Sequence, residues 1–241
     1  MKKKRKVERY NVSVIFPSYN EKENIKEVIN KVSKSLGKNL YEIIVVDDNS
    51  PDETWKIVEN MKNPRYKVIR RMKERGLASA VACGINKANG NVIVWMDCDL
   101  GIPPEVVSRL IRKLKWCDVV IGSRYVKGGK DSRSLFRRFV SYSINLFASS
   151  ILGFKVRDYT SGFVAVKKVV LDKIKFSREG FGEYFIEFVY KCLKNNYKVV
   201  EVGYHYRYRK WGVSKLDNSL FTLLKYGLQY AYKIIKVRLN L

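Results

Sequence analysis

Hydrophobic positions in the first half of the chain follow two alternating patterns. Short, mostly apolar runs, typical of buried strands, occur at 12–16, 42–46, 66–70, 91–96 and 118–122. Between them, apolar residues recur at the three- and four-residue spacing of a helix face over 21–36, 52–61, 76–89 and from 103 onwards. Strands that alternate with helices and are apolar along most of their length predict an α/β fold. Its mostly parallel sheet would be flanked by helices on both faces.

The second half of the chain lacks this regular alternation. A basic loop at 127–132 precedes an expected helix at 134–151, and another helix is expected at 183–195. We interpret 160–167 as a pair of strands and 198–208 as one long aromatic strand. Because no stretch is rich enough in Pro, Gly or Ser to act as a linker, we expect this half to belong to the same domain.

Composition changes at both ends of the chain. The basic arm at 1–10 resembles a nuclear-import tag. We favour an arm that touches an anionic membrane, and an added tag is a third alternative. Residues 11–216 are expected to form the main domain and 217–241 a separate C-terminal helix.

The C-terminal helix is predicted to be amphipathic. One face carries the apolar residues Leu220, Leu224, Leu228, Ala231 and Ile235. Another face carries Lys225, Gln229, Lys233 and Lys236. A basic amphipathic helix of this kind lies in a membrane interface or packs against its own domain, and the sequence leaves both interpretations open.

The net charge of the chain indicates which kinds of binding partner are favoured. The chain has 48 Lys and Arg against 23 Asp and Glu, a formal net charge of +25, while 46% of its residues are hydrophobic, as in a globular protein. This excess favours nucleic acids, anionic lipid headgroups or phosphorylated substrates. Since no zinc finger, RNA-recognition signature or helix-turn-helix is recognisable, a nucleic-acid-binding protein is kept only as the rival interpretation, and no nucleic acid is expected.

Cysteine usage and hydropathy bear on the compartment. Four scattered cysteines without C-x-x-C spacing indicate a reducing environment rather than a disulfide framework. The lone His205 excludes a three-histidine metal site within one chain. No apolar run of about 18 residues predicts a transmembrane helix, and no apolar stretch follows the basic N-terminus as in a signal peptide.

Two carboxylates, Asp97 and Asp99, follow directly on the apolar run that ends at Met96. Residues two apart on an extended strand point the same way, so both acids are expected on one side of a strand end. Like charges this close favour a cation between them, and a hard divalent ion with phosphate oxygens is the usual solution. The pair therefore predicts a metal–diphosphate site, with a turn bearing two solvated acids as the alternative.

Polar motifs also follow the other predicted strands. Residues 17–21 come after the first strand and 47–50 after the second, as 97–99 come after the fourth. Ligands of open α/β sheets bind outside the carboxyl ends of the strands. We therefore expect the three motifs to form one site.

Four motifs occur in a specific order along the chain: Phe16–Glu21, Val46–Asp52, Arg75–Ala78 and Asp97–Asp99. In this order the chain resembles the family 2 glycosyltransferases of GT-A fold. The second half is most similar to the dolichyl-phosphate mannose synthases and related polyprenyl-phosphate glycosyltransferases. That similarity rests on Gly122–Tyr125, Leu135–Arg138 with Ser141, Asp158–Phe163, Arg209 and Gly212–Leu216. The resemblance spans about residues 11–216.

The resemblance implies a metal-dependent, inverting transfer of a sugar to a dolichyl or polyprenyl phosphate at a membrane surface. Mannose from GDP-mannose is the first choice of donor and glucose from UDP-glucose the second. Mg²⁺ or Mn²⁺ is the implied cofactor. The implied location is peripheral, on the cytoplasmic face of the membrane. A hydroxyl acceptor is the alternative within the same enzyme class, and a non-catalytic family member is a further one.

The resemblance also implies roles for individual residues. Asp97 and Asp99 would bind the metal, and Arg137 and Ser141 the acceptor phosphate. The implied catalytic residues are Asp97, Asp99, Arg124 and Asp158. The implied nucleotide-sugar site comprises Pro17, Tyr19, Glu21, Val46, Asp48, Asp97, Cys98, Asp99, Arg124, Arg209 and Lys215.

Two further features bear on the chemistry: the residue at position 101, and the need for a general base. Gly101 stands where many of these synthases carry Gln as a further metal contact, so water completes the metal shell or metal binding is weaker. A lipid phosphate is already ionised, so no general base is required, whereas a hydroxyl acceptor would need one. Asp158 would be the best base candidate and Glu187 a poorer one. We expect Asp158 to position substrate instead, and both acids also have structural interpretations.

Overall fold

The computed structural model describes residues 10–207 and 220–239. The first half contains β1 (Val12–Ser18), α1 (Ile25–Leu36), β2 (Leu40–Asp47), α2 (Thr54–Asn60), β3 (Tyr66–Arg70), α3 (Leu77–Lys87) and β4 (Val92–Trp95). The second half contains α4 (Val107–Lys113), β5 (Val119–Ser123), β6 (Lys130–Asp131), α5 (Leu135–Leu152), β7 (Val164–Lys167), α6 (Lys168–Leu171), α7 (Tyr184–Lys194), β8 (Val199–Gly203), β9 (His205–Tyr206) and α8 (Leu220–Leu239). Short 3₁₀ helices occupy Gly37–Asn39 and Pro104–Val106.

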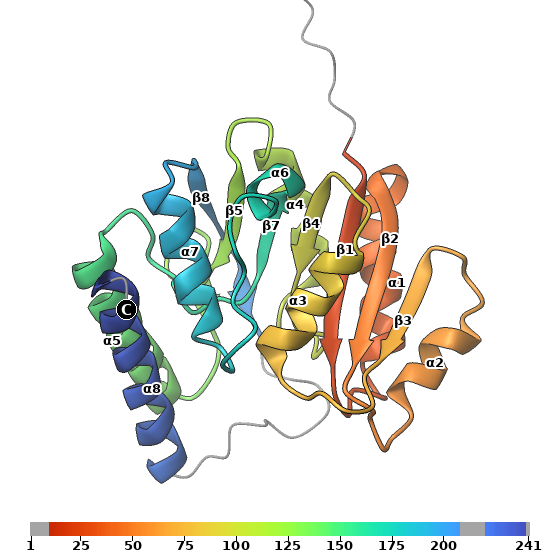
Figure 1. Cartoon of the computed structure of the whole chain (residues 1–241), viewed down its shortest axis with the longest axis horizontal. Helices are drawn as coiled ribbons and strands as arrows, with labels where there is room; N and C mark the ends of the chain where they lie inside the picture. Colours follow the sequence, from red (N-terminus) through yellow and green to blue (C-terminus); the bar gives the residue numbers. More distant parts are fainter. Residues whose placement is uncertain (1–9, 208–219, 240–241) are drawn as a thin grey trace, which may run out of the picture.

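Seven strands form one sheet in the order β3-β2-β1-β4-β7-β5-β8 (Figure 1). Strand β7 runs antiparallel to β4 and β5, and every other pair is parallel. This confirms the expected mostly parallel α/β sheet. The register sets Ser18 opposite Asp47 and Ile15 opposite Trp95. The ends of β1, β2 and β4 therefore open on the same edge of the sheet.

Helices cover both faces of the sheet because successive strand residues point to opposite sides. On one face, Val14 and Phe16 of β1 are buried in the cluster that contains α1, α2 and α4. On the other, Ile15 joins the cluster of α3, α5, α7 and α8. There the Trp95 ring, at the end of β4, contacts Phe185 and Phe188 edge-on. This packing brings the start of α7 next to the residues that follow β4.

The expectation of a strand pair at 160–167 was wrong, because only β7 (Val164–Lys167) is a strand. The preceding residues are held to the end of β5 by other contacts. The hydroxyl of Ser161 donates to the carbonyl of Gly122, and the Gly122 amide donates to the carbonyl of Phe163 (2.9 Å). The Phe163 ring occupies the space of a Gly122 side chain, since a Cβ there would lie 2.2 Å from Phe163 Cδ1.

The single aromatic strand expected at 198–208 is two short strands in different sheets. Strand β8 ends at Gly203, and β9 then pairs with β6 in a separate two-stranded sheet. A Cβ at Gly203 would lie 2.3 Å from the carbonyl oxygen of Lys127, so the chain passes close to the loop after β5. Tyr204 bridges the two sheets, since its amide donates to Ser123 and its carbonyl accepts from Lys130.

Helix α8 packs against α5 and α7, but not by the face that its sequence suggests. Ile234 is fully buried, whereas Leu228 and Ile235 of the expected apolar face are exposed. Lys233 pairs with Glu187 of α7. The helix thus packs on its own domain by one side and leaves Leu228 and Ile235 of its predicted apolar face exposed. In the described part of the chain, no helix is long and apolar enough to cross a membrane.

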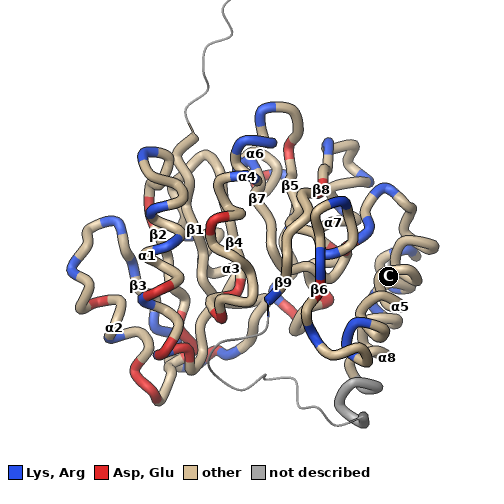
Figure 2. Tube along the Cα trace, turned by 180° about the vertical axis from the view of Figure 1, so that it is seen from behind, with Lys and Arg blue, Asp and Glu red and all other residues tan. Residues whose placement is uncertain are grey.

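Charged residues are spread unevenly over the fold. Lys and Arg occur on loops and helices all around the described trace, while a dense group of acidic positions lies near α2 (Figure 2). Asp47 ends β2, and Asp48, Asp52 and Glu53 fall between β2 and α2. The carboxylates expected to contribute to a site therefore belong to the carboxyl edge of the sheet.

Candidate active site

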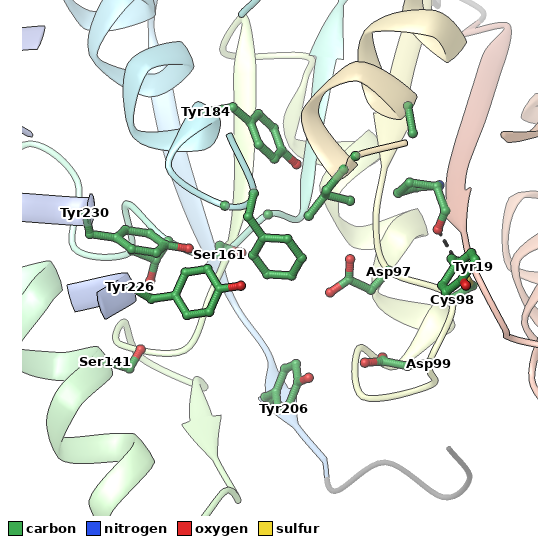
Figure 3. Close-up of a pocket in the computed structure, with 18 of the residues that line it drawn as sticks. Tyr19, Asp97, Cys98, Asp99, Ser141, Ser161, Tyr184, Tyr206, Tyr226 and Tyr230 are labelled. Atoms are coloured by element: carbon green, nitrogen blue, oxygen red, sulfur yellow. Dashed lines mark hydrogen bonds between the residues drawn. The ribbon is translucent and has the colours of Figure 1, made fainter. Parts of the chain in front are cut away.

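A cavity of about 430 Å³ lies at the carboxyl ends of β1, β4 and β5 and is closed on one side by α5 and α8 (Figure 3). Ten of the residues singled out from the sequence line it. They are Pro17, Tyr19, Glu21, Asp48, Asp97, Cys98, Asp99, Arg124, Arg137 and Ser141. The fold thus brings together side chains that lie more than a hundred positions apart in the sequence.

Of the other four predicted residues, two are described and do not line this cavity. The Val46 side chain is buried in the core, so only its backbone remains a candidate for nucleotide binding. Asp158 lies behind Arg124 and is fully buried. Arg209 and Lys215 lie outside the described residues.

At one end of the cavity, Asp48 and Tyr19 are held in fixed positions. The Asp48 carboxylate accepts hydrogen bonds from Arg71 Nε (2.7 Å) and from the Gly76 amide (2.8 Å). The Arg75 guanidinium lies 5.3 Å from the centre of the Tyr19 ring. A flat ring next to a buried acceptor is suited to a nucleotide base, whose ring N–H requires such an acceptor.

The turn after Asp99 fixes the orientation of that carboxylate. Leu100 adopts a left-handed conformation (φ 60°), which a non-glycine residue takes only where the surroundings enforce it. The Gly101 amide then donates to Asp99 Oδ1 (2.9 Å). Between the two acids, the Cys98 thiol donates to the Pro17 carbonyl (3.4 Å), which links this turn to β1.

Asp97 and Asp99 both project into the cavity (Figure 3), as a divalent cation site requires. Carboxylate oxygens are ligands that Mg²⁺ and Mn²⁺ prefer. Over the described ranges 10–207 and 220–239, no group of three His, Cys, Asp or Glu side chains is arranged to hold a metal. A metal held by these two aspartates would take its remaining ligands from phosphate oxygens and water.

The space next to Gly101 is filled by Tyr206. A Cβ at Gly101 would lie 2.9 Å from both Cζ and Oη of the Tyr206 ring and 3.0 Å from Asp99 Oδ1. The Gly101 carbonyl also accepts from the Arg207 amide (2.8 Å). The ring of Tyr206 therefore stands where a longer side chain at position 101 would begin, which gives the unusual glycine a steric reason.

Arg124 forms a buried ion pair at the centre of the site. Its Nε and backbone amide both donate to Asp158 Oδ2 (2.9 Å each), and its Nη2 donates to Asp158 Oδ1 (2.6 Å) and Thr160 Oγ1 (2.8 Å). Burial disfavours the charge on Arg124, but the Asp158 carboxylate outweighs this and raises the pKa of Arg124. Arg124 also lines the cavity, and the bonds to Asp158 and Thr160 use its Nε and Nη2.

Glu201 supports the ion pair from behind. Its carboxylate accepts from the amides of Arg157 (2.8 Å) and Asp158 (3.0 Å), and burial raises its pKa. Glu187, the other candidate base, also has a structural role. It pairs with Lys191 and Lys233 and does not line the cavity. The position of Asp158 behind Arg124 agrees with positioning rather than base catalysis.

The opposite end of the cavity is lined by arginines and a serine. Arg137 and Ser141 are one turn apart on α5, whose first turn is capped by Ser134. Ser141 Oγ accepts from the hydroxyl of Tyr125 (2.8 Å). Nearby, Arg133 is fixed by Asp131 and lies over the Tyr206 ring (5.3 Å). Phosphate oxygens are the ligands that such donors bind best.

The aromatic residues that line one side of the cavity were not predicted from the sequence. Tyr184 lies at the start of α7, near Asp97. Burial raises the pKa of the Tyr184 phenol, and the charge of the Asp97 carboxylate raises it further. Among the unselected lining residues, Arg75, Gly76, Ser161 and Gly162 belong to motifs already quoted, whereas no local signal marked Tyr184 or Tyr206. The remaining ones include Arg133, Val140, Ile144, Phe181, Tyr226, Gly227 and Tyr230.

Acidic side chains gather at one end of the cavity and most of its arginines at the other. Glu21, Asp48, Asp97 and Asp99 follow β1, β2 and β4, where Arg75 also lies, whereas Arg124 follows β5, Arg133 follows β6 and Arg137 belongs to α5. This combination of fold and site defines an α/β protein with one end suited to a metal-bound diphosphate and the other to a second anion.

The chain belongs to glycosyl transferase family 2, whose family model matches residues 13–175. It is 41% identical over 233 residues to the dolichol-phosphate mannosyltransferase of Pyrococcus furiosus, covering 93% of this chain but 64% of that protein. It is 33% identical over 231 residues to the polyprenol monophosphomannose synthase of Mycolicibacterium smegmatis, covering 90% of this chain and 86% of the relative.

Solved structures agree with the assignment of the fold. Glucosyl-3-phosphoglycerate synthase from Mycobacterium tuberculosis, solved with Mn²⁺, UDP and phosphoglyceric acid, superposes with a TM-score of 0.74. The match covers 95% of this chain and 78% of that one at 18% identity. The expected GT-A architecture is therefore confirmed.

Proposed function

We propose that this chain transfers mannose from GDP-mannose to a polyprenyl or dolichyl phosphate, with inversion and with Mg²⁺ or Mn²⁺ as cofactor. The observation that carries the proposal is that Asp97 and Asp99 line the same cavity as Arg137 and Ser141. A nucleoside diphosphate and a lipid phosphate are two anionic groups that have to meet in one site. The names of the two relatives point to the same acceptor class and to the same sugar.

The donor would lie at the acidic end. Tyr19 and Asp48 provide a ring face and an acceptor for the base, and Asp97 and Asp99 would hold the metal. A bound divalent cation neutralises the charge that develops on the departing nucleoside diphosphate. The related synthase from Mycobacterium tuberculosis has been solved with Mn²⁺ and with Mg²⁺ together with UDP, which supports the same type of cofactor here.

The acceptor phosphate would lie at the basic end, held by Arg124, Arg137 and Ser141. One of its ionised oxygens attacks the anomeric carbon while the bond from that carbon to the diphosphate oxygen breaks. The electron pair leaves with the nucleoside diphosphate, and the configuration at the anomeric carbon inverts. Because the attacking oxygen is already ionised, the reaction needs no general base, which agrees with a buried Asp158 that faces Arg124.

A membrane surface would supply the lipid acceptor. Helix α5 exposes a stripe of Leu135, Phe139, Tyr142 and Leu146, and the neighbouring α8 exposes Leu228, Tyr232, Ile235 and Leu239. Apolar stripes on two adjacent helices are suited to the interface of a bilayer. The four free cysteines support a reducing location, on the cytoplasmic face of the membrane.

The test is transfer of labelled sugar from GDP-mannose to dolichyl phosphate, with Mn²⁺ or with EDTA, measured in the organic phase. We expect labelled lipid only with the metal, and less of it when UDP-glucose is the donor. Label transfer that persists in EDTA would contradict the metal-dependent mechanism. Nucleotide binding without any transfer to lipid phosphate would contradict the proposed acceptor.

A further inference from the structure

A second hollow lies beside the cavity, between the residues after β5 and the start of α5. Its lining includes Tyr125, Lys130, Asp131, Arg138, Phe139 and Tyr142. We propose that this groove binds the headgroup of an anionic phospholipid. The inference rests on the proposed function, because it places the groove on the membrane-facing side of a lipid-modifying enzyme.

The groove carries positive charge that no acid neutralises. Within 10–207 and 220–239, neither Lys130 Nζ nor the Arg138 guanidinium pairs with a carboxylate, and both residues are exposed. Asp131, the one acid in the lining, is engaged by Arg133 through Nε (3.0 Å), Nη2 (2.6 Å) and the backbone amide (3.0 Å). Two cations therefore remain for a phosphate group.

The rim of the groove is apolar on the side of α5. Leu135, Phe139 and Tyr142 are 78%, 68% and 54% exposed, and they belong to the same stripe as Leu146. A phosphate held by Lys130 and Arg138 would leave its glycerol and acyl chains beside this stripe. Since a nucleic acid or a phosphopeptide has no long apolar chain to place there, charge and apolar surface together favour a phospholipid.

The groove shares a wall with the cavity. The Tyr125 hydroxyl donates to Ser141, which lines the cavity, while the ring of Tyr125 contacts that of Tyr142 (5.9 Å) in the groove. The Arg124 guanidinium lies 5.2 Å from the Tyr125 ring and lines both spaces. A bound headgroup would therefore hold the acceptor end of the cavity at the level of the bilayer surface.

The test compares binding to vesicles of phosphatidylcholine with and without phosphatidylglycerol by co-sedimentation. The groove variant is Lys130→Gln/Arg138→Gln. Its matched control, Lys62→Gln/Arg112→Gln, removes the same charge from exposed positions after α2 and on α4. We expect the groove variant to bind phosphatidylglycerol vesicles about tenfold more weakly and the control to lose less than about twofold, because cations act within a short distance of the anionic surface.

Charge-preserving exchange provides a further check. Lys130→Arg/Arg138→Lys is expected to bind as the wild type does. If the groove and control variants lost vesicle binding equally, overall charge alone would account for the attraction, and the proposal would be overturned. Equal binding of the wild type to neutral vesicles would overturn it as well. So would a concentration-dependent dimer that Leu135→Ser/Phe139→Ser dissociates while vesicle binding is unchanged, because a second copy would then cover this face.

Transfer to a short-chain, water-soluble polyprenyl phosphate by the wild type is measured separately. Its absence would contradict the proposed function, whereas the vesicle experiment alone decides whether the groove binds a headgroup.

Discussion

The guanidinium of Arg124 is held against the carboxylate of Asp158 by two parallel hydrogen bonds of 2.9 and 2.6 Å, and both side chains are shielded from solvent. Asp158 therefore does not line the cavity itself and affects it by holding Arg124 in position. The amides that bind Glu201 fix the backbone of Asp158 from the other side. The arginine that would contact a phosphate is thus positioned by two successive carboxylates.

Asp158→Asn tests this positioning role. Removing one partner leaves a buried guanidinium without its counter-charge, so we expect a loss of about 3–5 kcal/mol in the free energy of unfolding. Urea unfolding measures it. The pH–rate profile of the remaining activity should keep its acidic limb, because no base has been removed. Loss of that limb would show Asp158 to be the base.

Gly101→Gln tests the steric relationship with Tyr206. A side chain at 101 meets the Tyr206 ring at 2.9 Å and Asp99 Oδ1 at 3.0 Å, so the ring and the Asp99 carboxylate have to shift to admit it. We expect kcat/KM for the sugar donor to fall at least about tenfold, since small displacements of catalytic groups have effects of this size.

The double variant Gly101→Gln/Tyr206→Ala provides the control, because it removes the obstructing ring. We expect it to recover most of the loss, relative to Tyr206→Ala alone. A double variant as impaired as the sum of the two single ones would contradict the steric explanation.

Glu187→Gln tests the attachment of α8. Burial raises the pKa of the Glu187 carboxyl, but Lys191 and Lys233 outweigh it and the pKa is lowered from 4.5. A lowered folded-state pKa means that the carboxylate stabilises the fold above pH 4.5 and that this contribution is lost as the pH falls through the lowered value. The free energy of unfolding of the wild type should therefore exceed that of the variant by about 1 kcal/mol near neutral pH. The difference should disappear in acid.

Hydrogen exchange locates the effect. Near neutral pH, amides of α8 should exchange faster in Glu187→Gln than in the wild type, while those of β1 and β2 should not change. Equal protection of α8 in both proteins would mean that the ion pair with Lys233 does not hold the helix.

The first half of the fold was predictable because its strands are mostly apolar runs and its helices carry one periodic face. The second half depends on contacts between distant residues. The turn at Gly203 exists because the chain passes the backbone of Lys127, and residues 160–163 follow the Phe163 ring that covers Gly122. Neither contact has a local signature, so the strand pair and the long strand were wrong predictions.

The candidate site was predictable where its residues sit in motifs, as Asp97 and Asp99 do at the end of a strand. Asp158 belongs to such a motif, but its separation from the cavity depends on the orientation of Arg124, which only the tertiary structure gives. Helix α8 shows the opposite case. Its sequence carries an apolar face, yet Leu228 and Ile235 of that face are exposed, while Ile234, on another face, packs against the domain. The apolar face of a helix therefore does not by itself identify the surface that it contacts.

Steady-state kinetics of Asp99→Asn and Arg137→Gln, with Arg112→Gln as the control for charge, decide whether the two substrates occupy opposite ends of the cavity. We predict that Asp99→Asn abolishes the metal dependence and lowers kcat by about a hundredfold or more. We predict that Arg137→Gln raises the KM for polyprenyl phosphate by about tenfold or more and leaves the KM for GDP-mannose unchanged. If Arg137→Gln instead weakened only the donor, or left the acceptor KM at the level of Arg112→Gln, the division of the cavity between the two substrates would be contradicted.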